Sequence, residues 1–398
     1  MKVTLLYSKY LSDPTGASAV MRFLHESKSL FEDKGVDIDY YTRENIFPNK
    51  IKGSKAAEIH GIKKYLYNLI DSHCRTNSLA ALLHLYIRSG RAAKTLVSRY
   101  RQLNRKADVV FMHELNTCYY YLKTRKKEDT AKVVLVVHTN GELYKMDFIQ
   151  YPCLRKGFLS KYYTSKGEFV LKHIDKIGFV AESSSLHFIE IHPRFDKNNV
   201  FFNYNGVPEY KVNDTTKNPE VLSICCVGTI CERKGQRFII EALKELPENL
   251  LGKIHINIIG NGTIKDELYN TCKDNNILDF ISFLGSRTDV AEILAENDIF
   301  ILPSLDEGLP ISILEAMRQG LPIISTRVGG IPEMIIEGET GFLIEPSKEG
   351  VKDFLMNLDK YDWKKMGDNS KRLFDERFSL HSMVNGYSEV FHLSLIHI

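Results

Sequence analysis

Long hydrophobic runs are missing from this sequence. Its longest uncharged apolar stretch, residues 77–87, is far shorter than the roughly 20 residues that a helix needs to cross a bilayer. The start, MKVTLLYSKYLSD, turns polar after a short apolar run, which indicates a first β-strand and not a secretory signal. We therefore expect a cytoplasmic protein without transmembrane segments, and peripheral association with the inner face of the plasma membrane stays open.

Paired cysteines and clustered metal ligands are also missing. The seven cysteines are scattered, and none has the C-x-x-C spacing of a zinc or redox site, so a reducing compartment fits them best. Asp37-Ile-Asp39 has the spacing of a D-x-D metal motif, but it lies in an alternating run that we interpret as a strand. No other group of histidines and carboxylates has ligand spacing. The sequence therefore predicts no metal site and no cofactor.

The chain as a whole lacks a large net charge, but one stretch of it is strongly basic. The net charge is only +3, and we expect no nucleic-acid partner. Residues 52–106, however, contain twelve lysines or arginines against Glu58 and Asp71, a local charge of 12 − 2 = +10. Three interpretations of this basic stretch stay open: a solvated helical surface, contact with an anionic membrane, and contact with an anionic polymer.

Short, nearly all-apolar runs alternate with helix-length segments in the first half of the chain. This pattern is typical of parallel strands that are buried on both faces and joined by helices. It predicts a doubly wound α/β domain. The predicted strands are residues 2–8, 37–41, 108–113, 132–138, 176–181 and 199–205.

A second alternation follows the polar segment 208–220, which has the composition of a linker. Its predicted strands are residues 221–228, 253–260, 279–285, 298–304, 321–326 and 341–345. The fold class is therefore α/β, with two Rossmann-like doubly wound domains, and ligands are expected at a central cleft that both domains face. We predict an N-terminal domain over 1–208, a C-terminal domain over 209–378, and a segment 379–398 that packs back on the first.

The segment DEGLPISILEAMRQGLPIISTRVGGIPEMI, residues 306–335, carries the most chemical information. Pro310 suits the first turn of a helix, so Glu307, Gly308 and Leu309 come just before it. Free amides at a helix N-terminus attract phosphate, and glycine allows a ligand to approach the backbone closely. Glu315 follows Glu307 by eight residues, and its carboxylate can accept hydrogen bonds from two neighbouring sugar hydroxyls.

The E-x7-E pair Glu307/Glu315 in this segment resembles the signature of the retaining GT-B glycosyltransferases of family 4. The likeness extends, in the family's order, through VGTICERKGQRFIIEAL (227–243), IIGNGTIKDEL (258–268), FLGSRTDVAEIL (283–294) and NGVP (205–208). It covers nearly all of the second domain. In the first domain it rests on the strand, glycine loop and helix near Gly16 and on the segment His138-Thr-Asn-Gly141.

The resemblance implies a role for each matching residue of the second domain. Lys234 would bind the donor pyrophosphate and offset the charge of the leaving diphosphate. Glu315 would hold the ribose hydroxyls, and Glu307 would contact the hydroxyls of the sugar. The backbone of Gly308, Leu309, Pro310 and Ile311 would surround sugar and phosphate.

In the first domain the resemblance implies two contacts. Gly16 would let its loop approach the donor, and His138 would reach the transferred sugar. One departure concerns the arginine that many family members have directly after the first strand's glycine, where this sequence has Thr229. Arg233, next to Lys234, is the candidate substitute for that phosphate contact.

The predicted function is the transfer of a sugar, with retention at the anomeric carbon, from a nucleotide-diphosphate sugar to a glycan or lipid-linked acceptor, in surface or extracellular polysaccharide biosynthesis. Two alternatives stay open: another GT-B nucleotide-sugar enzyme such as an epimerase, and a non-catalytic partner subunit that binds sugar nucleotides. A dehydrogenase is disfavoured because Gly260-Asn-Gly262 lacks the third glycine of the dinucleotide fingerprint.

Overall fold

The computed structural model describes residues 1–13, 15–47, 73–212 and 220–395. The chain divides into two compact units, Met1–Asn203 with Val384–Ile398, and Tyr204–Met383. The divisions lie about five residues from the expected positions after residues 208 and 378. The shift has a physical reason: Val207 donates to the Phe378 carbonyl and accepts from the Leu380 N–H, so both crossings are bound together inside the second unit. Much of the predicted linker, residues 213–219, lies outside the described residues.

The first unit is built on a sheet whose described strands are all parallel, in the order β2-β1-β3-β4-β5-β6. Each strand matches a run predicted from the sequence. Its order reverses between β1 and β3, which is the topological switch point of such sheets. The strands are β1 Lys2–Tyr7, β2 Asp37–Thr42, β3 Val109–Met112, β4 Lys132–Val137, β5 Lys176–Phe179 and β6 Val200–Phe202.

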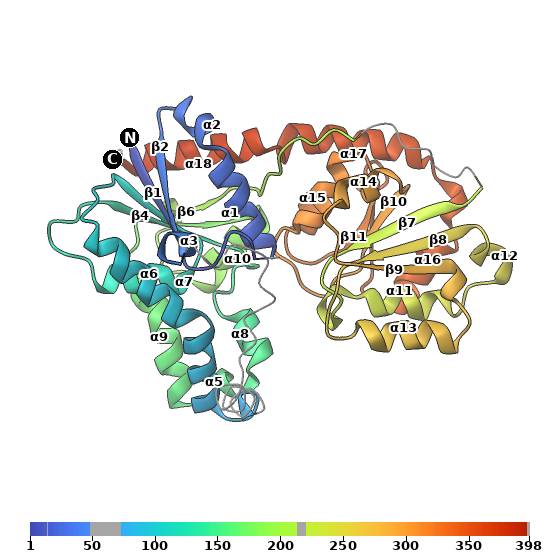
Figure 1. Ribbon diagram of the computed structural model, residues 1–398, viewed down its shortest axis with the longest axis horizontal. Helices are drawn as coiled ribbons and strands as arrows, with labels where there is room; N and C mark the ends of the chain where they lie inside the picture. The colour runs from blue at the N-terminus through green and yellow to red at the C-terminus, as the bar shows by residue number, and fades with distance from the viewer. Residues whose placement is uncertain (14, 48–72, 213–219, 396–398) are drawn as a thin grey trace. The chain divides into compact units, whose positions relative to one another are not determined.

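Helices cover this sheet and bury its branched apolar side chains, among them Leu6, Val110, Val133 and Ile177 (Figure 1). The chain's last helix, α18 (Leu380–Leu395), also contacts this unit: the Phe391 ring lies beside Phe31 and Phe111. The other helices among the described residues of this unit are α1 Gly16–Glu26, α2 Lys28–Glu32, α3 Arg43–Ile46, α5 Ser78–Leu85, the π-helix η2 Tyr86–Gly90, α6 Arg91–Gln102, α7 Leu115–Lys123, α8 Lys145–Gln150, η3 Pro152–Arg155, α9 Phe158–His173, α10 Glu182–Ile191 and η4 Lys197–Asn199.

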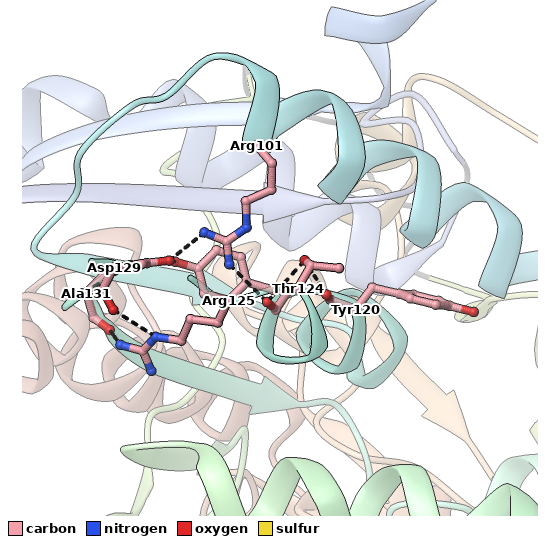
Figure 2. Close-up of polar contacts among 7 residues, drawn as sticks. Arg101, Tyr120, Thr124, Arg125, Asp129 and Ala131 are labelled. Carbon is pink, nitrogen blue, oxygen red and sulfur yellow. Dashed lines mark hydrogen bonds and ion pairs between the residues drawn. The ribbon is translucent and has the colours of Figure 1, made fainter. Parts of the chain in front are cut away.

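Two arginines near the end of α7 serve the fold. Arg101 of α6 contacts Asp129 at 2.5 Å and donates to the Tyr121 carbonyl, while Arg125 donates to the carbonyls of Asp129 and Ala131 (Figure 2). Last-turn carbonyls of a helix have no partner within the helix, so cationic donors are favoured there. Part of the basic stretch is therefore structural.

The second unit repeats the design, with parallel described strands in the order β12-β11-β10-β7-β8-β9. Its switch point lies between β7 and β10. The strands are β7 Leu222–Val227, β8 Ile254–Ile259, β9 Ile281–Gly285, β10 Ile299–Leu302, β11 Ile323–Thr326 and β12 Gly341–Ile344. The helices are η5 Glu232–Lys234, α11 Gln236–Leu243, α12 Glu248–Leu251, α13 Lys265–Asp274, η6 Leu278–Phe280, α14 Val290–Ala295, α15 Ile311–Arg318, η7 Ile331–Glu333, α16 Lys348–Leu355, η8 Leu358–Lys360 and α17 Trp363–Arg377. The prediction of two Rossmann-like domains is confirmed.

Candidate functional site

The turn after β7 is fixed by two glycines. Gly228 has φ 157° and Gly235 has φ 71°. A side chain at Gly235 would meet the Pro303 carbonyl oxygen at 1.9 Å, so only glycine allows this turn to approach the end of β10. The Leu305 N–H donates to the Arg233 carbonyl at 2.8 Å. The loops after β7 and β10 are thus joined at the switch point.

Three charged side chains from these loops meet. The Nζ atom of Lys234 lies 2.7 Å from Oε1 of Glu307, and an Arg233 nitrogen lies 3.2 Å from the same oxygen. Arg233 also donates to the Asp306 carbonyl at 2.6 Å. Arg233 thus turns toward Glu307, as a substitute for the missing arginine would have to, whereas Thr229 is exposed.

Glu307 is held more tightly than its loop position suggests. Only 7% of the residue is exposed, and Ser304 donates a hydrogen bond of 2.8 Å to its carboxylate. Gly329, with φ 54°, packs against the Glu307 backbone, where a side chain would meet the carbonyl oxygen at 1.9 Å. A buried carboxylate needs charged or hydrogen-bonding partners, and Glu307 has both.

Helix α15 begins shortly after Glu307 in the sequence. The prediction that Pro310 occupies the first helical turn is off by one residue: with φ −70° and ψ 122° Pro310 is the N-cap, and Ile311 is the first helical residue. The difference arises because proline fixes φ but leaves ψ free. The Leu309 carbonyl accepts from Asn205, and the Gly308 carbonyl accepts from Gly330. These bonds hold the segment that precedes the helix.

Glu315 lies on α15, partly exposed. It stands near Arg318, which donates to the Pro208 carbonyl at 2.8 Å. Burial lowers the pKa of the Arg318 guanidinium, and the Glu315 carboxylate opposes that change. Lys234, Arg233, Glu307 and Glu315 therefore all belong to the second unit, on its switch-point loops and the helix that follows.

The two candidates of the first unit come from separate parts of its fold, the start of a helix and the end of a strand. Gly16 is the first residue of α1, whose N-cap Thr15 accepts from the Ser18 N–H at 3.2 Å. His138 directly follows β4 and remains partly exposed. Burial lowers its pKa to about 4, and the charge of Lys9 acts in the same direction. His138 is therefore neutral at physiological pH.

Sequence reasoning missed His113, which directly follows β3. Its Nδ1 lies 2.8 Å from Nε2 of His138. Burial, and then the charge of His138, hold the pKa of His113 well below its usual range. The signal was present, because His113 ends an apolar strand run just as His138 does.

Around the His138 loop, several buried polar atoms have no hydrogen-bond partner within the described structure. They are Thr139 Oγ1, Asn140 Oδ1 and Ser184 Oγ, with His113 Nε2. Buried polar groups normally have partners, so unpaired ones point to a place for water or ligand hydroxyls. Among the described residues, no group of three His, Cys, Asp or Glu side chains could hold a metal ion. No helix in the described part of the chain is long and apolar enough to span a membrane.

Residues 209–371 match the family model of glycosyl transferases group 1. The match lies within the second unit. N-acetyl-alpha-D-glucosaminyl L-malate synthase of Bacillus anthracis is 36% identical over 138 residues, which are 34% of this chain and 36% of that protein. The UDP-Gal:alpha-D-GlcNAc-diphosphoundecaprenol alpha-1,3-galactosyltransferase of Escherichia coli is 38% identical over 121 residues, 30% of this chain and 31% of the relative. The chain thus spans about a third of the length of these two relatives.

Solved structures extend the likeness to both units. Anabaena Alr3699/HepE in complex with UDP superposes with a TM-score of 0.67 at 16% identity, over 99% of this chain and 100% of the other. The sucrose-phosphate synthase of Thermosynechococcus elongatus gives a TM-score of 0.68 at 14% identity, over 99% and 98%. The fold is that of the GT-B glycosyltransferases, as the sequence motifs predicted.

Proposed function

We propose that this protein is a retaining glycosyltransferase that moves a sugar from a nucleotide-diphosphate sugar to a glycan or lipid-linked acceptor. The observation that carries the proposal is the contact of Lys234 and Arg233 with Glu307 directly before α15. Two cations and a helix N-terminus suit a diphosphate. The buried carboxylate suits a neighbouring sugar, whose hydroxyls donate to it.

Each residue has a part in this proposal. Lys234 and Arg233 bind the diphosphate and offset the charge that develops as it leaves. The backbone from Gly308 to Ile311 surrounds sugar and phosphate, Glu315 holds the ribose, and Glu307 contacts the sugar. In the first unit Gly16 permits close approach of its loop and His138 contacts the transferred sugar. The two cations supply positive charge, so the proposal includes no metal ion.

The relatives support a role in the assembly of surface or extracellular polysaccharides. Besides the galactosyltransferase named for a diphosphoundecaprenol substrate, they include the Amylovoran biosynthesis glycosyltransferase AmsK of Erwinia amylovora. An acceptor that is lipid-linked would place the reaction at the inner face of a membrane. Two alternatives can be told apart from a transferase. An epimerase would convert the donor without an acceptor, and a non-catalytic binding subunit would bind the donor without converting it.

A thermal-shift panel of nucleotide diphosphates and nucleotide sugars tests this function. One nucleoside diphosphate and its sugar conjugate should raise the melting temperature, because a ligand at 100 times its Kd stabilises the fold by about 2.7 kcal/mol. Product analysis with that donor then separates the alternatives. An isomerised donor without acceptor would indicate an epimerase, binding without any turnover a partner subunit, and no shift with any donor would contradict the proposal.

We also propose that an anionic membrane is the partner of the basic stretch. The part of that stretch over 52–72 lies outside the described residues, but residues 73–106 contain eight lysines or arginines and no carboxylate. On α5 and η2, Leu79, Leu83, Tyr86 and Ile87 are exposed at spacings of one helix face. Helix α9 packs against α5 (Figure 1). It begins with Phe158, which is 81% exposed and shortly follows Arg155 and Lys156 in the chain. Apolar faces flanked by cations suit the surface of an acidic bilayer.

Salt-reversible binding to acidic vesicles is the expected consequence. Each cation near an acidic leaflet contributes roughly 1 kcal/mol, and the Debye length falls from about 10 Å at 0.1 M salt to about 3 Å at 1 M. The double substitution Arg91→Glu with Lys94→Glu should weaken co-sedimentation by about tenfold or more at low salt. Arg101 is unsuitable for such a reversal, since it is paired with Asp129.

The matched control changes the charge equally in the second unit. Lys364→Glu with Lys365→Glu alters two exposed lysines of α17 and should leave vesicle binding unchanged. If the wild-type protein ignores acidic vesicles at low salt, or if both double variants lose binding equally, the proposed membrane contact is wrong.

A further inference from the structure

The two histidines at the carboxyl edge of the first sheet form a pair that the proposed function leaves unexplained. Strands β3 and β4 are parallel neighbours, with Met112 opposite Leu135. Residues that directly follow them therefore emerge at the same edge. His113 and His138 approach there with Nδ1 and Nε2 2.8 Å apart, a hydrogen-bond distance.

The surroundings hold the ring of His113 in place. His113 is only 7% exposed, whereas His138 is partly exposed. Phe111 meets the His113 ring edge-on with centroids 4.5 Å apart, and Tyr387 of α18 does so at 6.0 Å. Edge-on aromatic contacts of this kind are favourable and geometrically specific. His113 can therefore present its Nδ1 in one fixed direction.

One proton must lie between the two rings, and its position decides the chemistry of His138. Both rings are neutral, so each carries a single N–H. If His113 donates from Nδ1, then His138 accepts at Nε2 and must carry its own proton on Nδ1. If His138 donates from Nε2 instead, the Nε2 of His113 must carry a proton. The hydrogen bond that one ring nitrogen makes therefore determines whether the other nitrogen of that ring carries the proton.

The unpaired atom distinguishes the two arrangements. Nε2 of His113 is buried and has no hydrogen-bond partner among the residues that the structure describes. A buried N–H without an acceptor is rarer and costlier than a buried acceptor without a donor. If His113 donates from Nδ1, its buried Nε2 is an acceptor without a donor. If His138 donates instead, the Nε2 of His113 carries an N–H without an acceptor. The first arrangement is thus favoured.

We propose that His113 is a positioning residue that donates to His138 and fixes it as the Nδ1–H tautomer. His138 then presents a hydrogen-bond donor at Nδ1, suited to a hydroxyl or phosphate oxygen of the substrate. This role in the reaction rests on the proposed glycosyl transfer. The tautomer itself does not, because it is a property of the protein without substrate.

Nitrogen-15 NMR of the histidine rings in the full-length protein tests the tautomer directly. The signals of His138 are assigned by their loss in His138→Gln. In the wild type, its protonated nitrogen should be Nδ1. His113→Phe keeps an aromatic ring but has no donor, so the proton of His138 should move to Nε2, the position that free imidazole side chains prefer. His113→Asn should retain Nδ1–H, since its amide can donate from near the position of Nδ1.

Kinetics separates positioning from packing. With a donor identified as above, His113→Phe should lower kcat by about tenfold, the effect of one lost hydrogen bond, and His113→Asn should restore it to within about threefold. A role in packing alone predicts the reverse order, because phenylalanine fills the space and asparagine does not. An Nε2–H tautomer in the wild type, or no tautomer change in His113→Phe, overturns the proposal. Expected tautomers without any sugar transfer would instead count against the proposed function.

Discussion

Replacing Lys234 with alanine is expected to lower turnover by about 100-fold or more while the protein stays folded. The ammonium group lies within the paired loops after β7 and β10, with only 12% of its side chain exposed. A cation that is already in place when charge develops on a leaving diphosphate need not be reoriented, which is why losing one such group costs about 100- to 1000-fold in rate. Initial rates with a saturating donor measure the effect.

Lys244→Ala is the matched control for this variant. Lys244 is exposed and directly follows the last residue of α11, the helix whose start lies beside Lys234. Removing the same charge there should leave turnover near the wild-type value. Because Arg233 also contacts Glu307, the Lys234→Ala protein should stay folded, and circular dichroism should confirm it. Near-wild-type turnover in a folded Lys234→Ala protein would remove Lys234 from the proposed mechanism.

Strand positions could be predicted because buried parallel strands leave a strong sequence signal. The run from Lys132 to Val137 is almost wholly apolar, and every residue from Val133 to Val137 is buried. Glycine is required at tight turns for a similarly direct reason, as at Gly235, where both φ and the nearby Pro303 carbonyl exclude a side chain. Such constraints act on single residues, so one sequence suffices to detect them.

Contacts between distant segments could not be predicted in this way. The sequence motifs identified Lys234 and Glu307 as candidates. Their 2.7 Å contact, however, depends on β7 and β10 being neighbours in the sheet. The pairing of His113 with His138 depends likewise on β3 and β4 being neighbours. The basic stretch was treated as a uniform surface, although Arg101 serves the end of α7 and only its exposed neighbours are available to a partner.

The contact of Lys234 with Glu307 also makes the two carboxylates of the E-x7-E pair experimentally separable. Glu307 pairs with both of the cations that would receive a diphosphate, Lys234 and Arg233. Glu307→Gln removes that competition at almost constant volume. We therefore expect the variant to bind free nucleoside diphosphate as tightly as the wild type or more tightly. Sugar transfer should fall by about 100-fold, because a buried carboxylate that accepts hydrogen bonds from the sugar is lost.

Glu315→Gln should show the opposite pattern. Glu315 lies on α15, eight residues after Glu307, and the proposed partner of its carboxylate is the ribose. Hydrogen bonds to a charged acceptor contribute about 1.5–3 kcal/mol, so binding of diphosphate and nucleotide sugar should weaken alike, by about tenfold or more. Calorimetry of both variants with the free diphosphate and with the nucleotide sugar distinguishes the two residues.

The control for this pair is Glu296→Gln, which removes an exposed carboxylate of the same unit at the end of α14 and should alter neither ligand's affinity. A Glu307→Gln protein that loses free diphosphate, together with a Glu315→Gln protein that keeps it, would reverse the assignment of the two residues. Equal losses in both would mean that Glu307 supports the diphosphate site through Lys234, because a buried cation without its partner moves or loses its order. Only tight diphosphate binding combined with poor transfer in Glu307→Gln fits a carboxylate that serves the sugar.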